Sequence, residues 1–304
     1  MDATGGRRGL RLKILLTGKT GQVGYELERT LQGLGEVVAV DRQQMDLSNL
    51  DQVRDVIRTV RPQLIINPAA YTAVDLAEST PDLAMRINAD APGVMAIEAK
   101  KLGAALIHYS TDYVFDGEKL GSYTEADAPN PQSVYGRSKL AGEQAIQAAG
   151  IPHLILRASW IYGTRGKNFL LTVRRLAQER EELRIVADQF GAPTWCRTIA
   201  EATAHALGRL TTGGAHAALD QDAWATHTGL YHLTAQGRTS WHGFTQAIVV
   251  HPSLVKKPQV TPIATSDYPL PARRPRNSVL SSERFMQTFC GLPDWDAALK
   301  LCLD

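Results

Sequence analysis

The chain has 304 residues, of which 44% are hydrophobic and 21% charged, an ordinary globular composition. This length suits one large domain, or a domain with an added lobe, and is enough for an ample core. With 33 Lys and Arg against 31 Asp and Glu the net charge is only +2, so neither nucleic acid nor a membrane surface is an expected partner.

Residues 1–10 carry charge but no apolar run, so they are expected to form a flexible leader rather than a signal peptide. No apolar segment is long enough for a membrane span. The three cysteines, Cys196, Cys290 and Cys302, form no paired motif and fit reduced thiols in a cytoplasmic protein.

Short apolar runs alternate with helical periodicity in the first half, which predicts βαβ units and a parallel sheet. Strands are expected over 12–16, 37–40, 64–66, 105–109 and 153–158, and helices over 25–34, 81–101 and 135–149. Ser48, followed by Asp51, resembles a capping box for a further helix that stops before Pro62. Pro92 and Gly93 are expected to interrupt the helix over 81–101.

The alternation weakens after residue 165. A Gly-, Asp- and Pro-rich loop is expected over 116–131, a helix over 168–182 and irregular structure over 252–275. The predicted architecture is α/β: a doubly wound parallel sheet of Rossmann type with a smaller C-terminal substrate lobe. Residues 11–165, with a returning segment near 225–250, would form the dinucleotide-binding domain, and 166–304 mainly the substrate lobe.

Three glycines lie between the first expected strand and the first expected helix, at Gly18, Gly21 and Gly24. Glycines there let the backbone approach a pyrophosphate at a helix N-terminus, although the same spacing occurs in ordinary turns. Asp41 ends the second strand, where an acid can bind an adenosine ribose or simply stabilise a turn. Arg42 could pair with a 2′-phosphate, so both NADH and NADPH stay open.

Tyr135 and Lys139 stand at i and i+4 and therefore share one helix face. Reduction of a carbonyl creates an alkoxide that a tyrosine can protonate, and a lysine cation nearby would lower the pKa of that phenol. Thr111 or Ser110, at a strand end, would hold the carbonyl oxygen. The alternative is a surface tyrosine packed along a lysine stem. The order of glycine turn, Ser-Thr strand end and YxxxK helix favours a reductase.

Eight segments between residues 12 and 296 resemble, in order, motifs of the dTDP-4-dehydrorhamnose reductases, within the extended short-chain dehydrogenases. They read GKTGQVG, NPAAYTAVD, NADAP, HYSTDYVFDG, YGRSKLAGE, LRASWIYG, DQFGAPT and PARRPRNSVL. The resemblance implies hydride transfer from NAD(P)H to the C4 ketone of dTDP-4-dehydro-L-rhamnose, giving dTDP-L-rhamnose. It also implies a dTDP-sugar as the partner and is compatible with a homodimer.

The resemblance assigns roles to individual residues. Cofactor contacts are expected from the glycine turn, the second strand end and the loop after the third strand, at Gly18, Gly21, Gln22, Val23, Gly24, Asp41, Asp46, Leu47, Ala70, Tyr71 and Thr72. Tyr135 would donate the proton beside Lys139, and both would touch the cofactor. Thr111, Asp112, Trp160, Arg273 and Arg274 would contact the substrate, the two arginines at its diphosphate. Trp160 could instead be core, Asp112 a cap and the arginines a solvated pair.

In the family that these motifs resemble, some relatives have after DQFGAPT a glutamate proposed to bind magnesium at a dimer interface. Here Trp195, Cys196 and Arg197 follow that motif, so no bound metal is expected. Glu26 matches the rest of that pattern and is interpreted as a first-turn helix acid.

Two other functions compete with the reductase. Another sugar-nucleotide enzyme, an epimerase or dehydratase, would share the fold and the Thr-Tyr-Lys set. A non-catalytic NADP-binding regulator, like the beta subunit of methionine adenosyltransferase, would keep the cofactor pocket without turnover.

Overall fold

The computed structural model describes residues 12–213 and 218–304, so the expected leader over residues 1–10 lies outside the described residues. Within the described ranges the centre of the molecule is a six-stranded sheet with the strand order β10-β5-β4-β3-β1-β2, parallel throughout. Its strands are β1 (Lys13–Leu16), β2 (Glu36–Ala39), β3 (Leu64–Asn67), β4 (Ala105–Thr111), β5 (His153–Ala158) and β10 (Gly229–His232).

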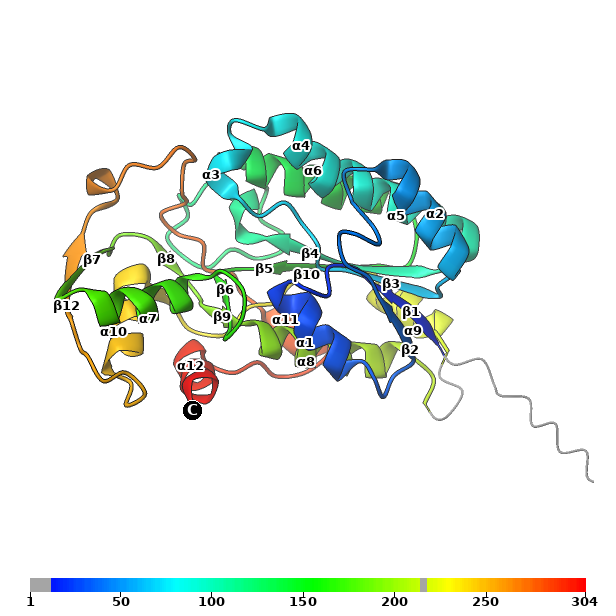
Figure 1. The fold of residues 1–304 in the computed structure, drawn as a ribbon. Helices are drawn as coiled ribbons and strands as arrows, with labels where there is room; N and C mark the ends of the chain where they lie inside the picture. The colour runs from blue at the N-terminus through cyan, green and yellow to red at the C-terminus, as the bar shows by residue number, and fades with distance from the viewer. Residues whose placement is uncertain (1–11, 214–217) are drawn as a thin grey trace, which may run out of the picture.

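Helices cover both faces of this sheet (Figure 1). One layer holds α2 (Leu50–Val60), α5 (Ala91–Leu102) and α6 (Val134–Ala149), and the other holds α1 (Gln22–Thr30), α8 (Cys196–Leu210), α9 (Gln221–His227) and α11 (Glu283–Thr288). Successive strand residues point to opposite faces, so Leu15 packs into one core and Leu16 into the other. Burial on both faces explains the apolar runs in the central strands, such as residues 64–66 of β3.

The chain order confirms the predicted doubly wound, Rossmann-type fold. From β1 the chain moves outward to β2, then returns to the other side of β1 and builds β3, β4 and β5 in the opposite direction. The reversal between β1 and β3 is the topological switch point, where open α/β sheets bind ligands beyond the carboxyl ends of the strands.

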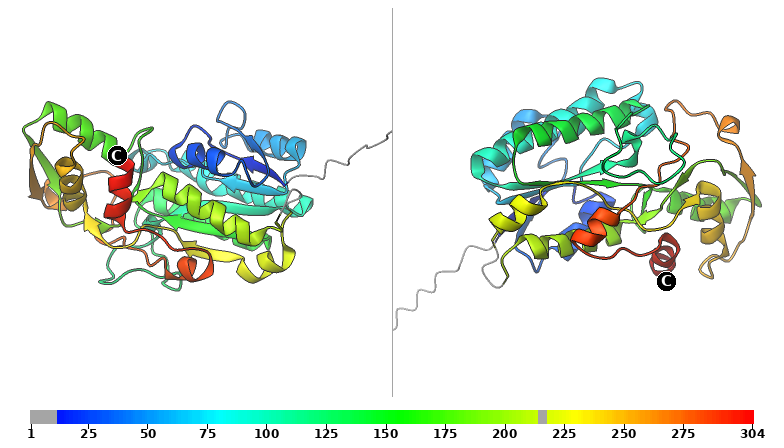
Figure 2. Two further views of the ribbon diagram at one scale, coloured as in Figure 1. Left: turned by 90° about the horizontal axis from the view of Figure 1, so that it is seen from below. Right: turned by 180° about the vertical axis from the view of Figure 1, so that it is seen from behind.

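A smaller lobe lies at one end of the sheet (Figure 2). Its core gathers around β7 (Glu182–Val186) and β12 (Gln259–Ile263), which pair in parallel, and includes α7 (Phe169–Glu179), α10 (Trp241–Val250) and α12 (Trp295–Leu303). Short strands connect lobe and sheet: β6 (Ile161–Tyr162), β8 (Phe190–Gly191), β9 (Thr194–Trp195) and β11 (Thr239–Ser240). The expectation of irregular structure over 252–275 was wrong at β12. This strand contains Pro262 and pairs with β7 alone, an edge position at which a missing N–H is tolerated.

The first helix begins earlier than expected. Gly21 is extended and caps α1, which therefore starts at Gln22 and ends at Thr30 instead of spanning 25–34. Glu26 consequently lies in the second turn, and α1 has no acid in its first turn. The interpretation of Glu26 as a first-turn acid was wrong for this reason.

Asn49, not Ser48, caps the second helix. The Asn49 side chain accepts a hydrogen bond from the Gln52 amide at 3.1 Å. Ser48 instead donates its hydroxyl to Asp46 at 2.8 Å, which removes it from the cap. The helix ends before Pro62 as expected, and Arg61 closes it in the left-handed conformation.

The helix expected over 81–101 is interrupted before Pro92 rather than at it. It consists of α4 (Pro81–Met85), a π-helical turn (Arg86–Asp90) and α5, with Pro92 in the first turn of α5 where its missing N–H costs nothing. Such π turns occur frequently at functional sites. Here the turn carries Asn88, which contacts the candidate site.

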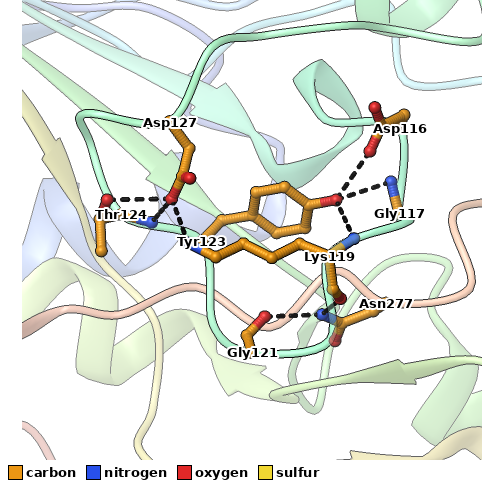
Figure 3. A network of polar contacts seen from close by, with 8 residues as sticks. All are labelled: Asp116, Gly117, Lys119, Gly121, Tyr123, Thr124, Asp127 and Asn277. Atoms are coloured by element: carbon orange, nitrogen blue, oxygen red, sulfur yellow. Dashed lines mark hydrogen bonds and ion pairs between the residues drawn. The ribbon is translucent and has the colours of Figure 1, made fainter.

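The loop over 116–131 is held by its own side chains (Figure 3). The Tyr123 hydroxyl donates to Asp116 at 2.8 Å and accepts from the Gly117 and Lys119 amides. Asn277 donates to the carbonyls of Lys119 and Gly121, at 2.7 and 2.9 Å, so the loop is joined to the segment that follows the PARRP motif.

Candidate active site

The residues predicted to bind cofactor or substrate converge on the carboxyl edge of the sheet. Gly18 follows β1, Asp41 follows β2, Ala70 follows β3 and Thr111 ends β4. Since β1 and β3 are neighbours at the switch point, the glycine turn and the 70–72 loop are brought together there. Gly18 lies against Ala69, because a Cβ added to it would sit 3.0 Å from the Ala69 Cβ.

The glycine turn is built for close backbone approach. Gly18 has a φ of 61°, in the left-handed region that favours glycine. A Cβ on Gly24 would lie 2.1 Å from the Gly18 carbonyl oxygen, so no other residue fits where α1 packs onto the turn. The first amides of α1 have no intrahelical acceptor and can face an anion. This backbone cradle fits a dinucleotide pyrophosphate.

Gln22 and Val23 belong to the first turn of α1. Val23 is buried in the core. Gln22 accepts a hydrogen bond from Asn168 Nδ2 at 2.7 Å, and Asn168 also caps α7 by accepting from the Leu171 amide. Asn168 therefore connects the glycine turn with the lobe, a connection that sequence reasoning missed.

Asp41 is at the end of β2 but already has local partners. Its carboxylate accepts from the amides of Gln43 and Gln44 at 3.0 and 3.2 Å and lies 3.5 Å from Lys19 Nζ. Partial desolvation opposes these contacts, yet together they lower the pKa of Asp41. Arg42 is exposed and pairs with Asp46 at 3.3 Å, and Leu47 is buried beside them.

Asn88 holds the loop that contains Ala70, Tyr71 and Thr72. It accepts from the Tyr71 amide at 2.8 Å and donates to the Tyr71 carbonyl and to Ser138 Oγ, each at 3.0 Å. Asn88 is 1% exposed, so these bonds satisfy a buried amide. Sequence reasoning did not single it out, although the NADAP motif that contains it was the available signal.

Tyr135 lies in the first turn of α6. Ser133 caps this helix by accepting from the Gly136 amide at 3.1 Å. A Cβ on Gly136 would lie 2.2 Å from the Tyr113 carbonyl, so glycine is needed for the helix start to approach the end of β4. The rings of Tyr113 and Tyr135 meet edge to face, 5.5 Å between centroids.

Burial raises the pKa of Tyr135 to about 12, with a smaller lowering contribution from a hydrogen bond with Thr111 and a raising one from Asp112. Thr111 also donates to Asp112 Oδ1 at 3.0 Å. Burial raises the pKa of Asp112 to about 6. Within the described part of the chain, Ser110 Oγ and Asp112 Oδ2 are buried without a hydrogen-bond partner. The end of β4, where Asp112 acts on Tyr135, therefore holds two polar atoms whose hydrogen bonding is incomplete.

Lys139 is on the same helix face as Tyr135 but is directed into the sheet. Its Nζ donates to the Tyr109 carbonyl at 2.7 Å and lies 3.1 Å from His108 Nε2. Burial lowers the pKa of Lys139 to about 8. Burial dominates the pKa of Tyr135, so the expectation that Lys139 lowers it stays a prediction.

Trp160 follows β5 in an unusual conformation. Its φ of 48° lies in the left-handed region, where bulky side chains are rare. Its ring stacks on Trp241, with centroids 3.5 Å apart, and the Gly191 backbone contacts the same ring. Trp160 is only half-buried, so it is not simply a core residue. Trp241 was not anticipated from the sequence.

The two arginines of the PARRP motif have different surroundings. Arg274 is largely buried and donates to Asp75 at 2.7 Å, and its Nη1 has no partner among the described residues. The exposed Arg273 contacts Glu118 and Gln132 at 3.4 and 3.2 Å. Only Arg274 therefore has a buried donor free for an anionic ligand.

Across residues 12–213 and 218–304, no group of three His, Cys, Asp or Glu side chains is placed to hold a metal ion. Over the same residues, no helix has the length and apolar character needed to cross a membrane. A surface cavity of about 220 Å³, lined by residues of α8, α12 and the 290–293 segment, contains none of the predicted site residues.

Comparison with known proteins decides the family. The model of the RmlD substrate binding domain matches residues 12–304, nearly the whole chain. The chain belongs to this family.

Relatives of the RmlD family confirm the resemblance to dTDP-4-dehydrorhamnose reductases. The chain is 48% identical over 301 residues to the enzyme of that name from Burkholderia thailandensis, covering 96% of this chain and 98% of the relative. It is 44% identical to the one from Escherichia coli K12, covering 96% and 97%.

Solved structures of dTDP-4-dehydrorhamnose reductases are also similar to this chain. A dTDP-4-dehydrorhamnose reductase from Bacillus anthracis, in complex with NADP, has a TM-score of 0.86 and 33% identity, covering 96% of this chain and 99% of that one. A reductase from Clostridium acetobutylicum has the same TM-score at 36% identity, covering 96% and 98%. A UDP-glucose 4-epimerase from Thermus thermophilus, at 21% identity and a TM-score of 0.78, shows the shared fold alone.

Proposed function

We propose that this chain reduces the C4 ketone of dTDP-4-dehydro-L-rhamnose to dTDP-L-rhamnose with NAD(P)H, the last step of dTDP-L-rhamnose synthesis. The observation that carries the proposal is the position of Tyr135, half-buried beside Thr111 at the carboxyl end of β4 in a chain of the RmlD family. The relatives at 44–48% identity carry the reductase name, which favours this activity over an epimerase, a dehydratase or a regulatory subunit.

The cofactor would lie across the switch point. Its pyrophosphate would lie along the backbone of Gly18, Gly21 and Gly24, where glycine lets α1 pack closely onto the turn. Gln22 and Val23 would flank it, Asp41, Asp46 and Leu47 would contact the adenosine side, and Ala70, Tyr71 and Thr72 the opposite wall. When bound, the reduced nicotinamide supplies the hydride.

Tyr135 would donate the proton. As the C4 carbonyl gains two electrons with the hydride, negative charge develops on its oxygen, and the phenol hydroxyl donates its proton there. With a pKa of about 12 the phenol is protonated at neutral pH, as a proton donor must be. Thr111 would hold the carbonyl oxygen, and Lys139 would stabilise the phenolate that remains.

Substrate contacts would come from the sheet end and the lobe. The free Oδ2 of Asp112 can accept a hydrogen bond from a sugar hydroxyl. Trp160 would line the sugar or its nucleotide. The unpartnered Nη1 of Arg274 favours this arginine for the diphosphate, with Arg273 at its exposed side.

The assignment of cofactor binding to the sheet domain and of substrate binding to the C-terminal lobe is also a proposal. Residues 11–165 and the returning segment near 225–250 would bind the cofactor, and 166–304 mainly the sugar nucleotide. Strand β10 is the part of the returning segment that enters the sheet, whereas α10 packs in the lobe core. Free Cys196, Cys290 and Cys302 support a reducing, cytoplasmic location. A homodimer remains part of the proposal.

The direct test is an assay of the purified chain with dTDP-4-dehydrorhamnose and either NADPH or NADH. The proposal expects one reduced cofactor consumed per sugar nucleotide, with dTDP-L-rhamnose as the product. Binding of cofactor without its oxidation would support the regulatory alternative instead. Interconversion of a nucleotide sugar without net cofactor consumption would support an epimerase.

A further inference from the structure

A row of buried polar side chains crosses the sheet beneath the candidate site. Thr17 Oγ1 lies 2.6 Å from Asn67 Oδ1, Asn67 Nδ2 lies 3.1 Å from His108 Nδ1, and His108 Nε2 lies 3.1 Å from Lys139 Nζ. The row joins the carboxyl ends of β1 and β3 with β4 and α6, and none of its four residues is more than 2% exposed. Only Lys139 has a role in the proposed reaction.

His108 is neutral in this position. Burial, and next the charge of Lys139, hold the pKa of His108 well below its usual range. A neutral imidazole carries one proton, so one ring nitrogen donates while the other accepts. If His108 accepts a hydrogen bond from Asn67, it must therefore donate one to Lys139, and if it donates to Asn67, it must accept from Lys139.

Two complete hydrogen-bond arrangements satisfy this row. If the Asn67 NH2 faces Nδ1, then Nε2 carries the proton and donates to Lys139, which must be a neutral amine. If the amide is turned over, its oxygen accepts from Nδ1–H, and Nε2 accepts from a Lys139 ammonium. The Thr17 hydroxyl serves either arrangement, since it can donate to the amide oxygen or accept from the amide NH2.

The other groups around Lys139 do not change between these arrangements. The Tyr109 carbonyl accepts from Nζ, and the Tyr109 hydroxyl is engaged by Thr203. Glu143, one turn further along α6, favours the ammonium but is held by Arg157 of β5 through bonds of 2.9 and 2.6 Å. Of the two groups within hydrogen-bond distance of the Lys139 amine, only His108 can change between donor and acceptor.

We propose that His108 is a positioning residue for Lys139, which keeps the amine in one place whether it is charged or neutral. This inference rests on the proposed reductase function, in which Lys139 stands beside a phenol that becomes a phenolate. A buried amine next to a group that changes charge needs a partner that accepts a hydrogen bond from the charged amine and donates one to the neutral amine. An imidazole backed by a carboxamide has this property.

The test compares three replacements of His108. His108→Gln places an amide near the position of Nε2, so it can still donate to or accept from Lys139. His108→Asn places its amide near Nδ1, short of the amine, and His108→Phe keeps the ring shape without nitrogen. The Gln and Asn variants both retain a buried amide, so their comparison stays valid even if His108→Phe does not fold.

The primary readout is the pH titration of Lys139, measured by NMR of protein whose lysines are labelled at the ε-carbon. The Lys139→Met variant identifies the signal of Lys139. A hydrogen bond to an ammonium is stronger than one to a neutral amine, so losing His108 destabilises the charged form of Lys139 more than the neutral form. We therefore expect the His108→Asn and His108→Phe variants to lower the midpoint of the Lys139 titration by about one pH unit, while His108→Gln stays near the unsubstituted protein. The basic limb of the pH profile of kcat should shift with the Lys139 midpoint. In the His108→Asn and His108→Phe variants kcat should fall roughly 10- to 100-fold, while the Kd of the cofactor changes little.

Equal shifts in all three variants, or no shift in any, would overturn the positioning role. The NMR titration needs no turnover, so it separates this inference from the proposed function. Absence of cofactor oxidation by the unsubstituted protein would refute the reductase alone.

Discussion

The indole ring of Trp160 lies flat against that of Trp241, with centroids 3.5 Å apart and planes within 3° of parallel. The backbone of Trp160 is left-handed, a conformation that costs a bulky residue of the order of 1–3 kcal/mol and persists only where its surroundings enforce it. Here the Trp160 ring is packed against Trp241 and the bare backbone of Gly191. Strain of this kind gathers at ligand sites, which agrees with a substrate role for Trp160.

Gly191→Ala should displace the Trp160 ring, because the new Cβ would lie 2.4 Å from a ring carbon. We expect KM for the sugar nucleotide to rise roughly 10-fold and stability to fall by about 1–3 kcal/mol, with cofactor affinity retained. Gly208→Ala, in a helix with open space around it, is the matched control and should be neutral or slightly stabilising. Equal effects of the two changes would remove the argument for a constrained Trp160.

Tyr135→Phe should bind cofactor normally and lose at least ~100-fold in kcat, the usual contribution of a positioned general acid. Steady-state turnover and cofactor fluorescence titration measure the two effects separately. Tyr109→Phe is the control, since that hydroxyl bonds to Thr203 within the core and should matter for stability only. Near-normal kcat in Tyr135→Phe would mean that another group donates the proton.

Asp41→Ala should raise KM mainly for NADH, by about 10-fold or more, as expected for a lost hydrogen bond to a charged acceptor. NADPH should be affected less, because its 2′-phosphate does not favour a carboxylate neighbour. Asp51→Ala, at an exposed helix position, provides the comparison. If the ratio of the two KM values does not change, Asp41 does not contact the ribose and serves only its turn.

Glu143→Gln should destabilise the fold by about 3–5 kcal/mol, because it leaves Arg157 charged, buried and incompletely paired. Urea unfolding measures this change. Glu179→Gln breaks an exposed pair with Arg175 and should cost less than about 1 kcal/mol. Replacing both partners, with Glu143→Leu and Arg157→Met, should recover most of the loss. A small effect of Glu143→Gln alone would show that water reaches this pair.

Asp112 should make stability depend on pH in an unusual direction. Its pKa is raised from 3.8 to about 6, so the folded protein binds its proton more tightly than the unfolded chain does. The stabilisation is complete below pH 3.8 and is lost as the pH rises through about 6, to the extent of about 3 kcal/mol at 1.36 kcal/mol per pH unit.

The Asp112→Asn variant isolates this contribution from that of buried His232, whose lowered pKa acts in the opposite direction. The unfolding free energy of Asp112→Asn minus that of the unsubstituted protein should increase between about pH 4, close to the unfolded pKa of 3.8, and about pH 7, above the folded pKa of about 6. A difference that is constant across this range would show that folding does not raise the pKa of Asp112.

Local patterns predicted most of the sheet. Runs such as 64–66 and 154–156 are apolar because both faces of the strand are covered, and this signal does not depend on distant residues. Strand β12 could not be predicted in this way, because Pro262 is tolerated only through its edge position beside β7. The π turn at Arg86–Asp90 is likewise set by tertiary packing, since a Cβ on Gly142 would meet the Asn88 carbonyl oxygen at 2.1 Å.

For the site, the sequence predicted which residues lie on the same helix or strand, but not which residues their side chains contact. Tyr135 and Lys139 were placed on one helix face by their spacing. That Lys139 reaches His108 depends on the packing of α6 against β4, which no local pattern encodes. Asn88, Asn168 and Trp241 were missed because each acts across more than one part of the fold.

Strand β10 supplies one outer edge of the central sheet with residues that come long after its neighbour β5 in the chain. During synthesis from the N-terminus, β5 therefore leaves the ribosome with its backbone amides and carbonyls unpaired on one side until residue 232 has followed. An unpaired apolar strand is a template for aggregation. Truncation near residue 165 would make that transient state permanent, so such a fragment is a poor candidate for expression on its own.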